Sequence, residues 1–253
     1  IDVRGKGFSG GINYRTYVTS NQYDTNGVLT NTITITNNFT YQNGHGPSGG
    51  SGGAPYGGVA GGFANSSSYR TNTYGSATAP LDPGSGGKAS SAAPYVGSHG
   101  GGAVRIVADQ VVVNGAINAD ALISSYESWD SGGSGGGVYI TCRTITGTNG
   151  LISADGSKSS GGGGAGGGGR IAILYDTNAQ SLLPMPLFRC SAAGGYSKTD
   201  VTNSGEIGTL YFPDSALFSP TNLFTGQWMA PAPTGTYTLT TGQSATSGCG
   251  CRV

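Results

Sequence analysis

The feature that most constrains this chain is a repeated unit that begins with a run of glycines. Each unit continues with an alternating strand, a turn, and a second short strand that ends in alanine. Equivalent glycines stand 35 and 32 residues apart, at Gly102, Gly137 and Gly169. A repeat with a period of about 20–50 residues is typical of solenoids, propellers and arrays, in which each unit buries its apolar face against the next. We therefore predict a repeat architecture.

The strands of the unit carry apolar residues at every second position, as in VRIVA (104–108) and VYITC (138–142). This is the period of a half-buried β-strand. Asn–Gly turn dipeptides follow at 114–115 and 149–150. The second strands, AINAD and LISAD, are too short to be stable without the equivalent strand of the next unit. We predict an all-β fold, a parallel β-helix or β-solenoid of about four rungs, with inward-pointing Ile106, Ile140 and Ile171.

Glycine supplies 49 of the 253 residues, roughly a fifth against an average near 7%. Glycine runs mark places where backbones pass closely, so we predict long glycine-rich loops on one side of the solenoid. The alternative is polyglycine II packing, in which extended helices of three residues per turn lie side by side. Residues 159–169 and 49–62 suit it, although they lack a glycine at every third position. Both interpretations are open at this point.

The repeat divides the chain into two parts. Residues 1–212 form the predicted solenoid, and residues 213–253 lose the repeat and form a predicted C-terminal extended arm or cap. Within the solenoid, residues 11–42 read as an inserted β-hairpin that turns at an Asn–Gly dipeptide. Residues 43–99 are a Gly/Ser/Tyr/Pro loop tract, which we expect to lie along the solenoid on three anchors, Tyr56, Tyr74 and Tyr95.

Charge and hydropathy exclude several classes of partner. Charged residues make up 9% of the chain and the formal net charge is zero, which argues against nucleic acid or an anionic membrane surface. No stretch reaches the roughly 18 apolar residues of a membrane span. The sequence begins at Ile1 without an initiator Met, which we interpret as a processed or trimmed form.

The order of motifs carries a resemblance. From GSGG and GGGAVRI, through VVVNGAINAD and GGSGGGVYI, to ITGTNGLISADGS and GGGGAGGGGRIAILYD, residues 84–176 resemble the glycine-rich β-solenoid repeat regions of large bacterial secreted and cell-surface proteins. The resemblance implies export and a β-solenoid, and it brings no catalytic residues. The chain departs from the pattern by its Thr-rich hairpin, and at Cys142, Cys190 and Asp120–Ala121. These departures suggest a specialised, covalently tied member.

The four cysteines are disulfide candidates: Cys142, Cys190, Cys249 and Cys251. Because only two histidines accompany them, disulfides fit better than zinc, and three pairings are open. A bond between Cys249 and Cys251 closes a strained ring, so we expect each to find a distant partner and tie the tail down. A metal or redox role for the CxC tail is the alternative.

Two further pairs of residues are candidate ligand or modification positions. Asp120 and Asp155 occupy equivalent places beside turns, where a capping role is the simpler interpretation and a ladder of Ca²⁺ ligands the sharper one. Apart from this Ca²⁺, we expect no cofactor. Asn38 and Asn65 begin glycosylation sequons.

The acidic residues are spread too thinly for an active site, so we do not expect an enzyme. The exception is a loop that combines two acids with aromatic residues. It is a candidate carbohydrate contact or a plain polar loop, and its residues are Tyr126, Glu127, Trp129 and Asp130.

These features favour a secreted, extracellular or cell-surface structural protein that assembles with copies of itself as a fibre or coat subunit. The Thr/Tyr-rich tail at 236–242 suits addition of a strand to another subunit's edge. The alternative is an adhesin module that binds surface glycans. Less favoured are a polysaccharide-cleaving β-helix enzyme and an ice-binding protein, the latter from the row Thr32, Thr34 and Thr36.

Overall fold

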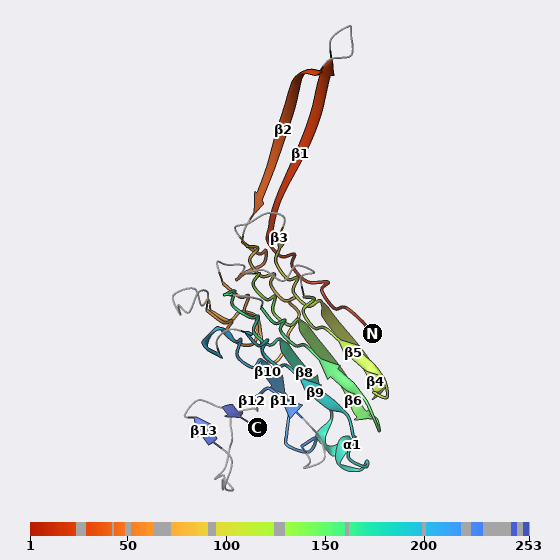
Figure 1. The fold of residues 1–253 in the computed structure, drawn as a ribbon. Helices are drawn as coiled ribbons and strands as arrows, with labels where there is room; N and C mark the ends of the chain where they lie inside the picture. Colours follow the sequence, from red (N-terminus) through yellow and green to blue (C-terminus); the bar gives the residue numbers. More distant parts are fainter. Residues whose placement is uncertain are drawn as a thin grey trace.

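The computed structural model describes most of the chain, and its strands form three sheets (Figure 1). The described residues are 1–23, 29–41, 43–48, 52–62, 72–90, 95–123, 130–159, 162–198, 201–218, 224–229, 244–246 and 250–252. Within them, helix is confined to the short α1 (Thr177–Ser181) and one 3₁₀ turn (Val201–Asn203). The predicted all-β class is therefore confirmed.

Two of the sheets are built from parallel strands that alternate along the chain. The parallel strands of the larger sheet are β4 (Ala103–Val112), β6 (Gly137–Thr146), β8 (Arg170–Leu174), β10 (Thr209–Tyr211) and β12 (Gln227–Met229). Those of the smaller sheet are β5 (Ala116–Asn118), β7 (Leu151–Ser153), β9 (Arg189–Ser191) and β11 (Phe224–Thr225). Because the chain passes from one sheet to the other and back, it forms the predicted β-solenoid.

The solenoid has about three full turns rather than the predicted four. The register aligns Ala103, Gly137, Arg170 and Thr209, so successive turns span 34, 33 and 39 residues. The step from Thr209 to its partner Gln227 spans only 18 residues. That stretch passes through β11 of the smaller sheet but, unlike the earlier turns, contains no glycine run.

The core lies between the two parallel sheets. Ile140 and Ile171 are fully buried, and Ile106 packs against the same cluster with partial burial, so the three predicted isoleucines point inward. Each fully buried side chain of this size contributes roughly 1.5–3 kcal/mol. Gln180 of α1 closes one end of the core, since its side chain both accepts from and donates to the backbone of Ile145, at 2.8 and 3.0 Å.

The glycine runs are packed extended helices, and not loops. Along residues 97–102, successive N–H groups donate in three directions in turn. Gly97 and Gly100 donate to Gly11 and Phe8, Ser98 and Gly101 to Ser131 and Ser134, and His99 and Gly102 to Leu122 and Val3. The run 131–136 shows the same alternation. A three-residue period with no bonds inside the run is polyproline II geometry, so the polyglycine II interpretation holds here.

We call the hydrogen-bonded runs the glycine bundle; they are residues 7–11, 54–61, 84–88, 97–102, 131–136, 164–169 and 203–206. At its closely packed glycines there is no room for a side chain. A Cβ atom on Gly101 would lie 1.8 Å from the carbonyl oxygen of Ala119. The tract from 43 to 99 contributes two of these runs and the start of a third, and its Tyr56 is fully buried beside Tyr74, with ring centroids 4.7 Å apart.

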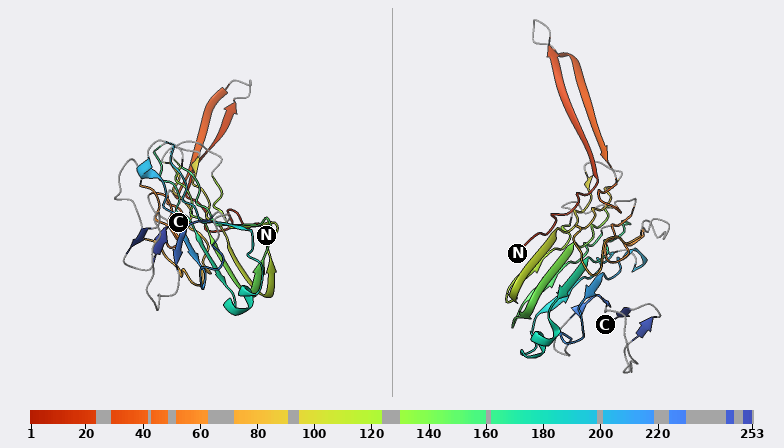
Figure 2. Two further views of the ribbon diagram at one scale, coloured as in Figure 1. Left: turned by 90° about the horizontal axis from the view of Figure 1, so that it is seen from below. Right: turned by 180° about the vertical axis from the view of Figure 1, so that it is seen from behind.

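The predicted hairpin is present and stands apart from the parallel sheets. β1 (Ile12–Tyr23) pairs antiparallel with β2 (Leu29–Tyr41), and β3 (Tyr95–Val96) pairs only with Ile12 and Asn13 at the base. Beyond that base the hairpin projects alone from the body (Figures 1 and 2). The predicted turn, Asn26–Gly27, lies outside the described residues.

The C-terminal strands add to the protein's own larger sheet. β14 (Gly250–Arg252) pairs antiparallel with β12, and β13 (Ser244–Thr246) pairs with β14. These two strands therefore cover the β12 edge of their own solenoid, whereas the sequence predicted a tail that joins another subunit.

Candidate functional site

The opposite end of the larger sheet is open. β4 is the last strand in the sheet order and pairs only with β6 among the described residues (Figure 1). It is ten residues long, and its inward residues Val104 and Val111 are buried. Val107 and Val112, by contrast, are 65% and 64% exposed. A long edge strand with exposed valines is a template for pairing with another strand.

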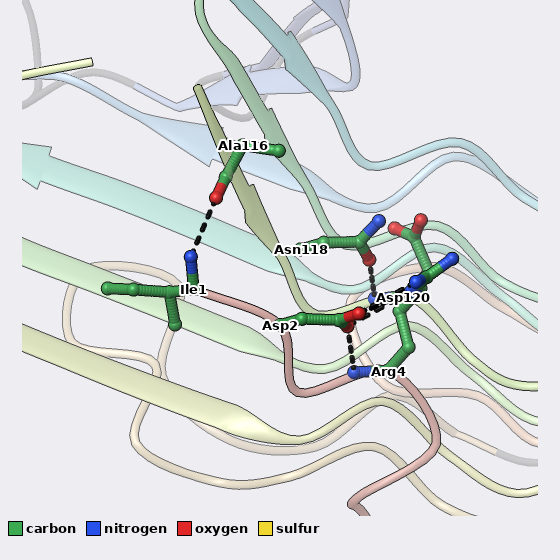
Figure 3. Close-up of polar contacts among 6 residues, drawn as sticks. All are labelled: Ile1, Asp2, Arg4, Ala116, Asn118 and Asp120. Carbon is green, nitrogen blue, oxygen red and sulfur yellow. Dashed lines mark hydrogen bonds and ion pairs between the residues drawn. The ribbon is translucent and has the colours of Figure 1, made fainter. Parts of the chain in front are cut away.

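The N-terminal residues extend the smaller sheet at this same end (Figure 3). The ammonium group of Ile1 donates to the carbonyl of Ala116 at 2.9 Å, and the N–H of Val3 donates to Asn118 at 2.8 Å. Asp2 forms a parallel bridge with Asn118. The smaller sheet is therefore one strand longer than the larger sheet here, and the edge of β4 lies beside this extra strand.

Two exposed ion pairs lie near the open end. Arg4 binds Asp2 through both guanidinium and backbone hydrogen bonds, which lower the pKa of Asp2 to about 2. Arg143 of β6 binds Asp109 of β4 at 2.7 Å, and its hydrogen bond lowers the pKa of Asp109. Ion pairs this exposed add little to the stability of the fold. Their main effect is on the distribution of charge at the open end.

Asp120 and Asp155 tie successive turns together. A carboxylate oxygen of Asp120 accepts from the N–H of Asp155 at 2.7 Å. Asp155 in turn accepts from the Ser191 hydroxyl at 2.6 Å and from the Ala193 N–H at 2.7 Å. Burial raises the pKa of Asp120. In this geometry each carboxylate bonds to groups of the following turn of the solenoid. Within the described ranges, no group of three or more His, Cys, Asp or Glu side chains could hold a metal ion.

Two of the disulfide candidates are free thiols. Cys142 in β6 and Cys190 in β9 are both buried in the core, where they pack as small apolar residues. Burial raises the pKa of both thiols, that of Cys142 to about 11. The expectation that they form disulfides is therefore corrected. Cys249 and the side chain of Cys251 lie outside what the structure describes.

The candidate carbohydrate loop is described only at its end. Asp130 is buried, and its carboxylate accepts from the N–H of Ser90, just after the run 84–88, at 3.1 Å. The remaining loop residues, together with Asn65, lie outside the described part of the chain: Tyr126, Glu127 and Trp129. Asn38 lies in β2, opposite Arg15 in the backbone register. The row Thr32, Thr34 and Thr36 also lies in β2, and its side chains are outside the description.

The residues of the open end were missed as a set by sequence reasoning. Arg105, Val107 and Asp109 alternate along β4 and are all exposed, so they form its outward face. The signal was present in the sequence as the alternation Arg-x-Val-x-Asp. This pattern indicates a binding surface only once β4 is known to be the edge strand. In a central strand the same alternation indicates only side chains that face the solvent.

Comparisons with known proteins give no match from which a function could be inferred. No helix among the described residues is long and apolar enough to cross a membrane. No protein-family model, curated protein or solved structure matches the chain. Function must therefore be inferred from the solenoid, the glycine bundle and the open end.

Proposed function

We propose that this chain is an extracellular structural protein that assembles with copies of itself, as a fibre or surface-coat subunit. The observation that carries the proposal is the edge of β4, which no other described strand covers, with exposed Val107 and Val112. Unpaired backbone groups in an edge strand bind other strands, and solenoids that stay monomeric usually cap their terminal repeat. The resemblance to bacterial surface repeats supports the extracellular setting.

The construction of the body suits a structural role. The glycine bundle is joined by hydrogen bonds between its runs, and the core is a continuous apolar cluster between two sheets. The zero net charge also removes the long-range repulsion that keeps many proteins apart. Because β13 and β14 cover the β12 edge, the proposed assembly uses the β4 end instead of the tail.

The test is the oligomeric state of the whole chain over a wide concentration range. Sedimentation velocity and electron microscopy should show dimers or larger assemblies that grow with concentration. Val107→Lys should reduce them, because lysine on an edge strand blocks pairing. A chain that stays monomeric at every concentration contradicts the proposal.

A carbohydrate-binding adhesin module is the second candidate. The observation that favours it is the hairpin of β1 and β2, which projects alone from the body while the C-terminal strands pair with their own sheet (Figure 2). A glycan array probed with the whole chain tests it, with Trp129→Ala as the variant. Binding that is lost in the variant supports an adhesin, and the absence of any bound glycan rejects it.

A further inference from the structure

The outward face of β4 has a symmetrical order of charges. Arg105 and Asp109 each lie two residues from Val107, one on either side, and all three are exposed. Val104 is buried on the opposite face of the strand, and Ile106 packs against the core. The outward face of the edge strand therefore carries a positive, an apolar and a negative side chain, in that order.

The backbone groups of two of these residues face the open edge. The N–H of Gly137 donates to the carbonyl of Gly102, so even-numbered residues in the first part of β4, before Asp109, face β6. In a sheet, successive residues direct their backbone groups to alternate sides of the strand. Arg105 and Val107 therefore direct their N–H and C=O groups away from β6. The pairing with β6 is interrupted at Asp109, and beyond it the N–H of Val113 donates to Thr146 of β6. An added strand therefore meets backbone partners at Arg105 and Val107, next to the exposed side chain of Asp109.

We propose that β4 pairs antiparallel with β4 of a second copy of this chain, with Val107 opposite Val107 on a two-fold axis. This deepens the proposed function, on which it rests, by naming the interface. In this register Arg105 lies opposite Asp109 of the second copy, and the same pair recurs across the axis. Opposite charges placed directly across a strand pair stabilise it, and the interface is self-complementary, as a two-fold contact requires.

Other registers lose this match. Sliding the pair until Arg105 lies on the axis sets arginine against arginine, and placing Asp109 there sets aspartate against aspartate. A parallel pairing in register places Arg105 opposite Arg105 and Asp109 opposite Asp109. These arrangements are disfavoured because like charges directly opposite destabilise a strand pair. Asp109 also keeps Arg143 of its own chain, which lies one strand back from the edge.

The experiment uses two charge variants of the whole chain. Arg105→Asp places two carboxylates opposite each other at both pairs, and Asp109→Arg does the same with guanidiniums. Each variant alone should self-associate at least about tenfold more weakly than the unmodified chain. An equimolar mixture of the two variants should recover association, because each charge again meets its opposite. Arg189→Asp is the matched control, since β9 is paired on both sides.

Sedimentation velocity distinguishes the outcomes, with circular dichroism to verify the fold of each variant. Recovery only in the mixture supports the two-fold register. If the unmodified chain assembles and both variants assemble equally well, the β4 pairing is wrong while the proposed self-assembly stands. Weakened variants that do not recover on mixing also overturn the register. If the unmodified chain is monomeric throughout, both the pairing and the proposed function fail.

Discussion

Position 170 holds an arginine where the aligned positions of the two preceding turns hold Gly137 and Ala103. Its guanidinium donates twice to the Tyr74 carbonyl, at 2.8 and 2.9 Å, and once to Tyr56, and it lies 5.4 Å from the Tyr56 ring centroid. Only 6% of Arg170 is exposed, and burial lowers its pKa. One side chain thus fastens the glycine bundle to β8.

Arg170→Met should lower the free energy of unfolding by about 2–4 kcal/mol, because the carbonyls of Tyr56 and Tyr74 lose a buried donor. Urea unfolding measures the change, with exposed Arg189→Met as the control. A loss no larger than that of the control contradicts the role given to Arg170.

Cys142 predicts a loss of stability in alkaline solution. Its pKa rises from 9.0 to about 11 on folding because burial disfavours the thiolate, so the folded state holds the proton more tightly. The contribution of the protonated thiol to the free energy of unfolding is complete below about pH 9. It is lost as the pH rises from about 9 through 11. Cys142→Val should lose less stability over this interval when the two proteins are unfolded in urea at pH 8 and 10.5. Equal losses count against the assignment.

Among the elements, the strands were predictable and the bundle was predictable only in part. Period-two alternation in residues 104–108 and 138–142 identified β4 and β6, because half-buried strands need it. From the sequence alone, the glycine runs could be loops or polyglycine II helices. The choice depends on which runs pack together, and the partners of each run come from distant segments. The buried thiols and the pairing of β14 with its own sheet escaped the sequence for the same reason: both depend on which segments become neighbours.

The bundle predicts a sharp contrast between two glycines. Gly101→Ala should destabilise the protein by about 3 kcal/mol or more, because the new Cβ meets the Ala119 backbone at 1.8 Å. Gly115→Ala is the matched control, since its Cβ meets nothing within 4 Å, and it should be neutral or slightly stabilising. Thermal unfolding of both variants measures the difference. Similar melting temperatures are incompatible with the packing described for the bundle.

At the scale of the whole molecule, the two ends of the larger sheet differ. β13 and β14 cover one edge, and β4 leaves the other open among the described residues. This asymmetry limits assembly through the larger sheet to one face, so pairing through β4 alone gives a closed dimer. In the proposed fibre or coat, this dimer is the building block, and growth beyond it uses other surfaces.

Removal of residues 244–253 should therefore enlarge the assemblies. The truncated chain keeps its core but exposes the edge of β12 as well as that of β4, and two open edges allow open-ended growth. Light scattering after size-exclusion chromatography measures the mass. A truncated chain of the same assembled mass as the full chain shows that the C-terminal strands do not act as a cap.

The hairpin joins the body through the run at residues 7–11, which is held by bonds directed sideways to neighbouring runs. Gly7, Phe8 and Gly11 donate to Gly100, Gly84 and Gly87, and none of these bonds lies along the run. A pulling force applied to the hairpin and directed along the run therefore loads these bonds in shear and simultaneously. They must break together, in contrast to a strand that is peeled from a sheet edge one bond at a time, so the attachment point is mechanically strong.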